Sequence, residues 1–257
     1  MADAHNPGAK LSVRALTRRF GGLVAVSHVD IDLHEGEVHA VIGTNGAGKS
    51  TLINMLSGEL AASSGSIHLE GRDVTQMPQP QRARAGVGRS YQRTTIFPEF
   101  TVLENCRLTA QAQAKPRPWR IWESAQHCDA SLQRAHAALA SAGLQHQAQT
   151  IAGSLSHGAK RQLEVAMCLA TEPQVLLLDE PLAGMGAEET ERMLTLLQQL
   201  KQGHAVLLVE HDMDAVFRIA DRITVMVNGA VVATGTPAQI RVDPVVRTAY
   251  LGEEEHA

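Results

Sequence analysis

The chain has 257 residues, of which 44% are hydrophobic, 19% charged and only 3% aromatic, and its formal net charge is −4. The apolar fraction is ordinary for a globular protein and too high for a disordered one, and the length allows one large domain or two small ones. General nucleic-acid binders carry a basic excess, so the net charge disfavours that class. The three cysteines form no CxxC pair, which argues against a disulfide scaffold or a zinc site.

The sequence contains no segment that is typical of a membrane span or a secretory leader. Its longest purely aliphatic run, Ala205 to Val209, is far shorter than the roughly 20 residues that a spanning helix needs. The first residues, Met1 to Lys10, are polar and lack the apolar core of a signal peptide. We therefore expect a soluble cytoplasmic protein.

The N-terminal part of the chain alternates between strand and helix patterns. Short apolar or alternating runs predict strands over Leu11–Leu16, Val24–Leu33, Val38–Ile42, Ser66–Leu69 and Val87–Tyr91. A glycine-rich loop follows the third of these strands, and the residues after the loop predict a helix over Lys49–Ser57.

The middle of the chain, from Thr101 to about Gly143, has helical spacing and few β-branched residues. Thr101 can cap the first helix of this region. The segment from Lys115 to Pro118 breaks the region into two helices, and Gly143 ends the second. A further helix is expected from Ser156 towards Ala170.

The last third alternates again. Strands are expected over Val175–Leu178, Ala205–Val209, Ile223–Val227 and Ala230–Thr234, and helices over Glu188–Gln202 and Asp214–Ala220 and after Pro237 and Pro244. Asn228-Gly229 is a strong signal for a two-residue turn between the last two strands. Strand–helix alternation at both ends of the chain predicts an α/β fold with a mostly parallel sheet and a helical insert in the middle.

Residues 43–50 match the pattern GxxxxGK[ST] of a phosphate-binding loop. The matching residues, with the one that follows, are Gly43, Thr44, Asn45, Gly46, Ala47, Gly48, Lys49, Ser50 and Thr51. Glycines let backbone N–H groups surround phosphate oxygens, Lys49 places a positive charge on the β- and γ-phosphates, and Ser50 offers a hydroxyl ligand for Mg²⁺. The strand before the loop and the helix after it are the context that this motif requires, so a plain glycine turn is disfavoured.

A second element of a phosphate site follows the predicted buried strand Val175–Leu178. Asp179 would hold the Mg²⁺ shell, directly or through water, and Glu180 would orient or deprotonate the attacking water. An apolar strand that ends in Asp-Glu is by itself more often a strand end before a turn. Together with the loop that contains Lys49, the two acids indicate hydrolysis of a nucleoside triphosphate.

A third segment, Leu155 to Glu164, lies shortly before this strand and resembles the signature of ABC-transporter ATPases, an LSGGQ-like stretch followed by a helix. By itself it would be an ordinary serine N-cap. Its spacing from Asp179 and the order of the three motifs are those of the family. The resemblance extends from about residue 11 to residue 252. It implies a P-loop NTPase core with a mostly parallel sheet, an N-terminal antiparallel β-subdomain and an inserted α-helical subdomain.

The resemblance also implies how a single ABC ATPase domain of residues 1–257 is organised. Residues of about 10–92 and 172–235 would form the core with its antiparallel β-subdomain, about 93–171 the helical subdomain with the signature, and about 236–257 a C-terminal helical tail. In this family two ATPase domains bind head to tail. Ser156 and Gly158 would then contact the γ-phosphate of ATP held by the partner's phosphate loop, so one chain would hold only half of each complete site.

Three more residues acquire a role through the resemblance. Phe20 is similar to the aromatic residue that stacks on adenine, Gln92 to the Q-loop glutamine that contacts Mg²⁺ or the water, and His211 to the switch histidine at the γ-phosphate. Outside that context they would be a core or hairpin phenylalanine, a solvated loop glutamine and a structural histidine at a strand end. The cofactors that the resemblance implies are ATP and Mg²⁺.

The chain departs from the family pattern at three places. Thr44 replaces the common proline of the phosphate loop. His157 and Ala159 replace one of the two glycines and the glutamine of the signature, so the contacts of that glutamine are lost. Gly186 stands where the D-loop usually ends in aspartate, so communication across a dimer is expected to differ. Because the phosphate-binding lysine, both acids and the histidine are retained, we expect an active ATPase.

Several stretches resemble the ATPase subunits of branched-chain amino acid importers, a subfamily that includes urea and amide importers. They are Arg19–Leu23, Phe97–Asn105, Leu182–Gly186 and the segment from Asp243 to Gly252. The resemblance implies a peripheral subunit on the cytoplasmic face of the inner membrane, which powers two transmembrane permease subunits. It would work head to tail with a second ATPase subunit, which is either another copy of this chain or a different chain, and indirectly with a periplasmic substrate-binding protein. No nucleic-acid partner is expected.

Three alternatives remain at this stage. They are the ATPase of a lipid or lipopolysaccharide exporter, a soluble ABC ATPase that acts on DNA or ribosomes, and a P-loop kinase or adenylate-binding module. The single phosphate loop and the ordinary length of the middle region disfavour the second. The signature and His211 disfavour the third.

Two clusters are candidates for contact with a membrane partner, the alternatives being a solvated basic face and a packed tryptophan pair. One comprises Arg82, Arg84, Arg89 and Arg93, and the other runs from Lys115 to Trp122. We hypothesise that they line the groove that receives a permease helix or lie near the lipid surface.

Overall fold

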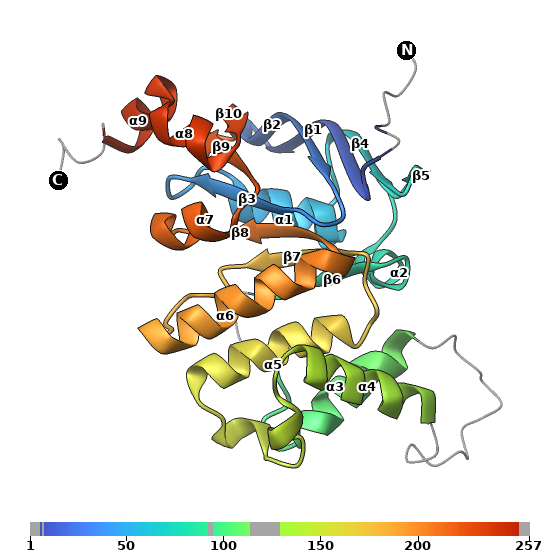
Figure 1. The fold of residues 1–257 in the computed structure, drawn as a ribbon. Coiled ribbons are helices and arrows are strands. Elements are labelled where there is room, and N and C mark those ends of the chain that lie inside the picture. Colours follow the sequence, from blue (N-terminus) through green and yellow to red (C-terminus); the bar gives the residue numbers. More distant parts are fainter. Residues whose placement is uncertain (1–5, 7, 92–94, 114–128, 252–257) are drawn as a thin grey trace.

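The computed structural model describes residues 6, 8–91, 95–113 and 129–251 (Figure 1). The first half of the chain contains β1 (Leu11–Phe20), β2 (Leu23–Leu33), β3 (Val38–Gly43), α1 (Lys49–Ser57), β4 (Ser64–Leu69), β5 (Arg72–Asp73), α2 (Gln79–Arg84), β6 (Val87–Arg89) and α3 (Val102–Gln113). The second half contains α4 (Asp129–Ser141), α5 (His157–Leu169), β7 (Val175–Asp179), α6 (Ala187–Leu200), β8 (Ala205–Val209), α7 (Met213–Ile219), β9 (Arg222–Val227), β10 (Ala230–Gly235), α8 (Pro237–Val242) and α9 (Pro244–Leu251). Short 3₁₀ turns lie at Gln145–Gln147, Ala152–Ser154 and Lys201–Gly203.

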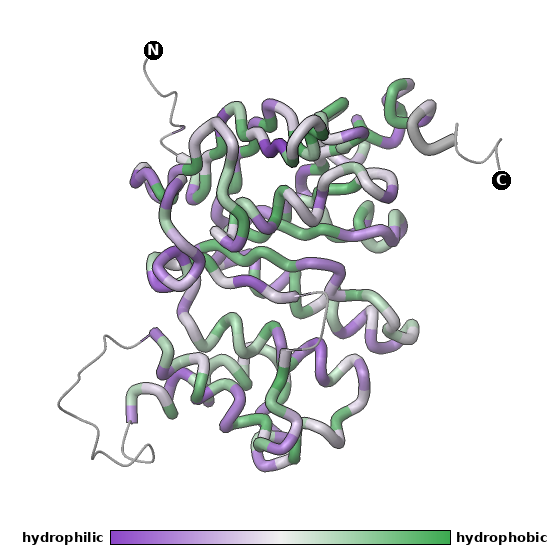
Figure 2. The backbone as a smooth tube through the Cα atoms, turned by 180° about the vertical axis from the view of Figure 1, so that it is seen from behind, coloured by the Kyte–Doolittle hydropathy of each residue, from purple (hydrophilic) through white to green (hydrophobic). Residues whose placement is uncertain are grey.

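The larger of two sheets has the strand order β10-β9-β3-β8-β7-β6. Its strands pair in parallel from β9 to β6, and β10 joins antiparallel through a hairpin with β9. Strands β3, β7 and β8 are buried along their whole length, which explains why their residues are mostly apolar, with His39 of β3 and Asp179 of β7 as exceptions. Figure 2 shows the same feature from behind, as green tube along the strands that cross the middle of the molecule.

The register of these parallel strands places the ends of three of them together. Asp179, the last residue of β7, pairs with Val209 of β8, and Val209 in turn pairs with Val41 of β3. The phosphate loop begins at the end of β3, while the predicted acid pair and His211 follow β7 and β8. The candidate site therefore lies at the carboxyl edge of the sheet, where ligands of α/β proteins bind.

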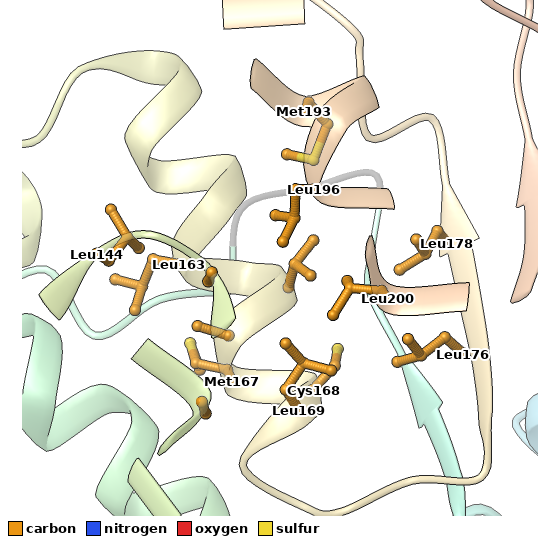
Figure 3. Close-up of a cluster of buried hydrophobic side chains, with 14 of the residues drawn as sticks. Leu144, Leu163, Met167, Cys168, Leu169, Leu176, Leu178, Met193, Leu196 and Leu200 are labelled. Atoms are coloured by element: carbon orange, nitrogen blue, oxygen red, sulfur yellow. The ribbon is translucent and has the colours of Figure 1, made fainter. Parts of the chain in front are cut away.

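The two faces of the larger sheet are covered by different layers. Leu176 and Leu178 of β7 point to a core shared with α5 and α6, shown in Figure 3. Leu177 points the opposite way, into a core shared with α1 and the smaller sheet. The helices α3, α4 and α5 form a group on the far side of α6 from the sheet (Figure 1). The expected α/β fold, with an antiparallel β-sheet near the N-terminus and a helical insert, is confirmed.

The smaller sheet has the order β2-β1-β4-β5 and is antiparallel. The prediction that the first strand ends at Leu16 is wrong, because β1 continues to Phe20 and pairs there with Leu23. The missed half contains Thr17, Arg18 and Arg19, whose polar side chains hid the strand from a hydrophobic pattern. The extension matters because it carries Phe20 to the tip of a hairpin.

Several local signals of the sequence are confirmed in the helical part and the last hairpin. Thr101 Oγ1 accepts a hydrogen bond of 3.1 Å from the backbone N–H of Glu104 at the start of α3. Gly143 has φ of +72° just after α4, as a C-terminal glycine should. Asn228 and Gly229 both have positive φ in the turn between β9 and β10. The break expected at Lys115 to Pro118 lies outside the described residues.

We expect Leu176→Ala to lower the free energy of unfolding by about 2–5 kcal/mol, because it removes a fully buried side chain from the core between β7 and α6. Urea denaturation followed by circular dichroism measures the loss. Val242→Ala, at a side chain that is 71% exposed, is the control and should cost less than about 0.5 kcal/mol. Equal losses for the two variants would contradict the packing described here.

Candidate nucleotide-binding site

The phosphate loop, residues 43–50, runs from the end of β3 to the start of α1 in a path that its glycines permit. Gly48 has φ of +96°, and a Cβ placed there would lie 2.3 Å from the carbonyl oxygen of Ala25. A Cβ on Gly43 would lie 2.1 Å from the carbonyl oxygen of Met226. The loop is also held by a hydrogen bond of 3.1 Å from Gly229 N–H to the Ala47 carbonyl. Side chains are therefore excluded where the loop packs against the two neighbouring hairpins.

Lys49 is buried at the first position of α1, with only 5% of its surface exposed. Its ammonium group donates hydrogen bonds to the carbonyl oxygens of Gly43, at 2.6 Å, and Thr44, at 2.9 Å. Burial lowers the pKa of Lys49 from its ordinary value. The charge therefore sits inside the curl of the loop, at the N-terminus of a helix, where a phosphate would be stabilised by both.

Asp179 is buried at the end of β7 and opposes this loop. Burial raises the pKa of its carboxyl group, and the guanidinium of Arg89 lies 3.9 Å from Oδ2. The other oxygen, Oδ1, is buried and has no hydrogen-bond partner among the described residues. A buried, unpaired carboxylate oxygen beside a phosphate loop is a donor suited to a hard divalent cation. Asp179 and the hydroxyl of Ser50 thus fit Mg²⁺.

Glu180 and His211 are brought together from the ends of β7 and β8. Nε2 of His211 lies 2.5 Å from Oε1 of Glu180, and the backbone N–H of Glu180 donates to the Val209 carbonyl at 2.9 Å. Glu180 has φ of +50°, a left-handed conformation that is uncommon for a residue with a side chain. Such strain persists only where the surrounding structure holds it.

Glu210 fixes the two loops on which these residues lie, a role that the sequence analysis did not assign. It is 3% exposed, and burial raises the pKa of its carboxyl group. Oε1 accepts the backbone N–H of Leu182 at 2.8 Å, and Oε2 accepts that of His211 at 3.1 Å. One carboxylate thereby joins the segment after Glu180 to the backbone of His211. An acidic residue directly after a fully apolar strand was the signal available.

A cavity of about 590 Å³ opens in front of these groups. Its lining includes Phe20, residues 45–46 and 48–51 of the phosphate loop and its helix, Glu180 and His211, and it extends over Asn228 and Gly229. Phe20 is 45% exposed, with the guanidinium of Arg18 4.5 Å from the centre of its ring. Phe20 is thus no core residue, and its ring forms one wall of the cavity.

The two signature residues lie elsewhere. Ser156 caps α5, with its Oγ accepting a hydrogen bond of 3.2 Å from Ala159 N–H, and Gly158 is in the first turn. Both line a separate hollow of about 210 Å³ and are absent from the lining of the larger cavity. Gln92 lies outside the described residues. The structure therefore groups Phe20 and the loop with Glu180 and His211 but not with the signature.

Arg82 and Arg89 of the arginine cluster turn inward, so these two do not belong to the solvated basic face that was the alternative to a partner contact. Arg82 is 1% exposed and donates hydrogen bonds to five backbone carbonyls, those of Met55, Leu56, Val74, Thr75 and Met77. Arg89 reaches inward and donates to Asn54 at 2.5 Å and to Ser57 and Glu59 at 2.7 Å. Both side chains form hydrogen bonds inside the protein, whereas Arg84 is exposed to solvent. Arg93 and the segment from Lys115 to Trp122 lie outside the described residues.

A glycine loop between a buried strand and a helix, with an acid pair across from its lysine, defines a P-loop protein that binds a nucleoside triphosphate. The family model described as "ABC transporter" matches residues 26–183, and the model described as "Branched-chain amino acid ATP-binding cassette transporter" matches residues 230–256. The chain belongs to the ABC transporter family and is an ATP-binding cassette with ATPase activity.

Curated relatives and solved structures agree with this assignment. The "High-affinity branched-chain amino acid transport ATP-binding protein LivG" of Escherichia coli K12 is 41% identical over 251 residues, which cover 95% of this chain and 98% of that protein. The protein named BraF, with the same description, from Pseudomonas aeruginosa is 41% identical over 255 residues with the same coverage.

Two solved cassettes have the same fold with TM-scores of 0.83. One is a nucleotide-free ATP-binding cassette from an ABC transporter, 29% identical, covering 94% of this chain and 98% of that chain. The other is a cassette of an ABC transporter in its ADP conformation, 30% identical, covering 95% and 99%. The expected P-loop NTPase fold is confirmed. In the described part of the chain, every helix is too short or too polar to cross a membrane.

We expect Arg89→Met to raise the Mg²⁺ concentration needed for tight ATP binding by about tenfold, since groups that contact a metal-binding carboxylate change metal affinity by such factors. The change removes the positive charge beside Asp179 and leaves that carboxyl group easier to protonate. Titration with a fluorescent ATP analogue at several Mg²⁺ concentrations measures the effect. Arg84→Met is the matched control on the exposed side of α2, and identical titrations for both variants would contradict the role given to Arg89.

Proposed function

We propose that the chain is the ATP-hydrolysing subunit of an importer for branched-chain or related amino acids and amides. The observation that carries the proposal is the 41% identity, over nearly the whole of both chains, to subunits named for high-affinity branched-chain amino acid transport. The match of residues 230–256 to a C-terminal model of that transporter type supports it independently.

In the proposed reaction, Lys49 and the backbone N–H groups of the phosphate loop bind the phosphates of ATP, and the exposed ring of Phe20 stacks on the adenine. Ser50 and Asp179 would hold Mg²⁺, which would supply charge neutralisation at the phosphates. Gln92 would contact Mg²⁺ or the attacking water. These residues bind and align the substrate, so the remaining chemistry falls to the groups at the γ-phosphate.

Glu180 acts on the attacking water. Its carboxylate takes a proton from the water while the water oxygen forms a bond to the γ-phosphorus. The bond from that phosphorus to the β-phosphate oxygen breaks, and ADP and phosphate result. His211, 2.5 Å from Oε1, fixes the carboxylate, and the buried Glu210 fixes the backbone of His211. The left-handed conformation of Glu180 aims its side chain into the cavity that Lys49 also lines.

The signature residues do not line this cavity, which supports a site shared between two subunits. Ser156 and Gly158 present a hydroxyl, a backbone N–H and a helix N-terminus, but in a hollow of their own. We infer that they meet the γ-phosphate of ATP bound to a second ATPase subunit, arranged head to tail. Two permease subunits would receive the resulting motion, and a periplasmic binding protein would deliver the cargo. The chain would lie on the cytoplasmic face of the membrane.

We expect Glu180→Gln to leave ATP affinity within about twofold while slowing hydrolysis by about 10²–10⁴-fold, because the amide cannot accept the proton of water. The ATP-bound dimer should then accumulate. Phosphate release and size-exclusion chromatography with ATP measure the two effects. Glu172→Gln, which changes an exposed carboxylate paired with Arg134, is the control. Wild-type turnover in Glu180→Gln would remove Glu180 from the reaction.

The transport role is tested with the assembled complex. Permeases that co-purify with the chain from membranes are placed in liposomes, and phosphate release is measured with the matching binding protein and single amino acids. We expect several-fold stimulation by leucine, isoleucine, valine or a related amide together with the binding protein. Stimulation by lipid or lipopolysaccharide alone would contradict the proposal and favour an exporter.

A further inference from the structure

A carboxylate of the same chain occupies the anion-binding end of the signature helix. Glu189 lies in the first turn of α6, and its Oε1 accepts the hydroxyl of Ser156 at 3.0 Å and the backbone N–H of Gly158 at 3.2 Å. Its Oε2 accepts the backbone N–H of Gly186 at 3.4 Å. One side chain therefore joins the N-terminus of α5 to the loop that precedes α6.

The fit depends on the missing side chain of Gly158. A Cβ built on Gly158 would lie 2.4 Å from Cδ of Glu189 and 2.6 Å from its Oε1. The carboxyl group thus fills the space directly above the Gly158 amide. The hydrogen bond from Ser156 lowers the pKa of Glu189 from its ordinary value, so the group is an anion at neutral pH. A helix N-terminus stabilises such a charge.

We propose that Glu189 is a built-in competitor of the γ-phosphate: its carboxylate holds the donors of Ser156 and Gly158 in the free subunit, and ATP of the partner subunit must displace it before the dimer closes. The inference rests on the head-to-tail dimer of the proposed function. The Glu189 carboxylate and a γ-phosphate cannot both bind the donors of Ser156 and Gly158, because they would compete for the same hydrogen bonds and repel each other.

The hollow offers the displaced carboxylate a new partner. Arg192 lines the same hollow and lies three residues after Glu189 on α6, a spacing at which side chains of a helix meet. The guanidinium of Arg192 lies 3.9 Å from the carboxylate of Glu188. This ion pair is exposed and therefore weak, so Arg192 can pair with Glu189 instead. Glu189 can therefore leave Ser156 by a rotation of its side chain, with α6 unmoved.

The same displacement reaches the loop that follows Glu180. Glu189 holds Gly186, at the position where the family usually has aspartate, and Glu210 holds Leu182 in the same loop. Removing one of the two carboxylates from this loop changes how it is tethered. Phosphate binding at the signature would thus change the contacts of the segment that follows the hydrolytic carboxylate in the same subunit.

The test compares Glu189→Ala with Glu188→Ala, both in a chain that also carries Glu180→Gln. The control removes the neighbouring carboxylate of the same helix, which pairs only weakly with Arg192. We expect Glu189→Ala to lower the ATP concentration at half-maximal dimer formation by about two- to fivefold, the worth of one exposed charge contact. The control should match the parent. ATP affinity of the monomer, measured at low protein concentration, should be equal in all three.

Hydrogen exchange of the isolated subunit checks the contact itself. Residues 156–160 should exchange faster in Glu189→Ala than in Glu188→Ala, because the Gly158 amide loses its acceptor. If Glu189→Ala does not fold, Glu189→Gln, which keeps the shape and removes the charge, replaces it in the measurement of the ATP midpoint.

The outcomes separate the two proposals. If Glu189→Ala still forms a dimer but its ATP concentration at half-maximal dimer formation is unchanged or raised, the proposed competition by Glu189 is wrong while the head-to-tail dimer stands. A raised value would make Glu189 a structural cap. Equal exchange of residues 156–160 in both variants also overturns it. If no variant forms a dimer at any ATP concentration, the head-to-tail arrangement of two copies of this chain fails, and the competitor fails with it.

Discussion

The parallel register of β3, β8 and β7 is the constraint on which the rest of the structure depends. Burial on both faces leaves these strands no freedom to slip, because a shift of one residue would exchange the two cores. With Asp179 fixed opposite Val209 and Val209 opposite Val41, the residues that follow each strand meet at one edge. The phosphate loop, the acid pair and His211 are adjacent for this reason, although up to about 170 positions of sequence separate them.

Much of this arrangement could be predicted from the sequence because its signals are local. A glycine loop after an apolar run, or two acids at the end of another, is visible within a dozen residues. The residues that were missed act across the chain: Arg89 contacts Asn54 35 positions away, Glu210 contacts Leu182 28 away, and Glu189 contacts Ser156 33 away. Helix α2 was missed for a related reason, since its one buried side chain is the charged Arg82.

The misreading of the arginines shows where composition misleads. A run of arginines is usually a solvated face, and Arg84 fits that description. Arg82 does not, because its planar guanidinium turns inward and donates hydrogen bonds to backbone carbonyls, among them those of Met55, Val74 and Met77. Burial lowers its pKa to about 10, which still leaves it charged at neutral pH. Arginine thus has a buried structural role at position 82 and is a solvent-exposed charge at position 84.

The carboxylate at the sheet edge and the carboxylate at the signature have opposite roles. At the sheet edge, burial pushes the pKa of Lys49 down and that of Asp179 up, so both charges are poorly stabilised by protein alone. Phosphate and Mg²⁺ would supply the partners that restore them. At the signature the anion is already present as Glu189, hydrogen-bonded and with a lowered pKa. In the head-to-tail dimer that we propose, one half of the shared site would gain charge from the ligand, whereas the other would give up a charge that it already holds.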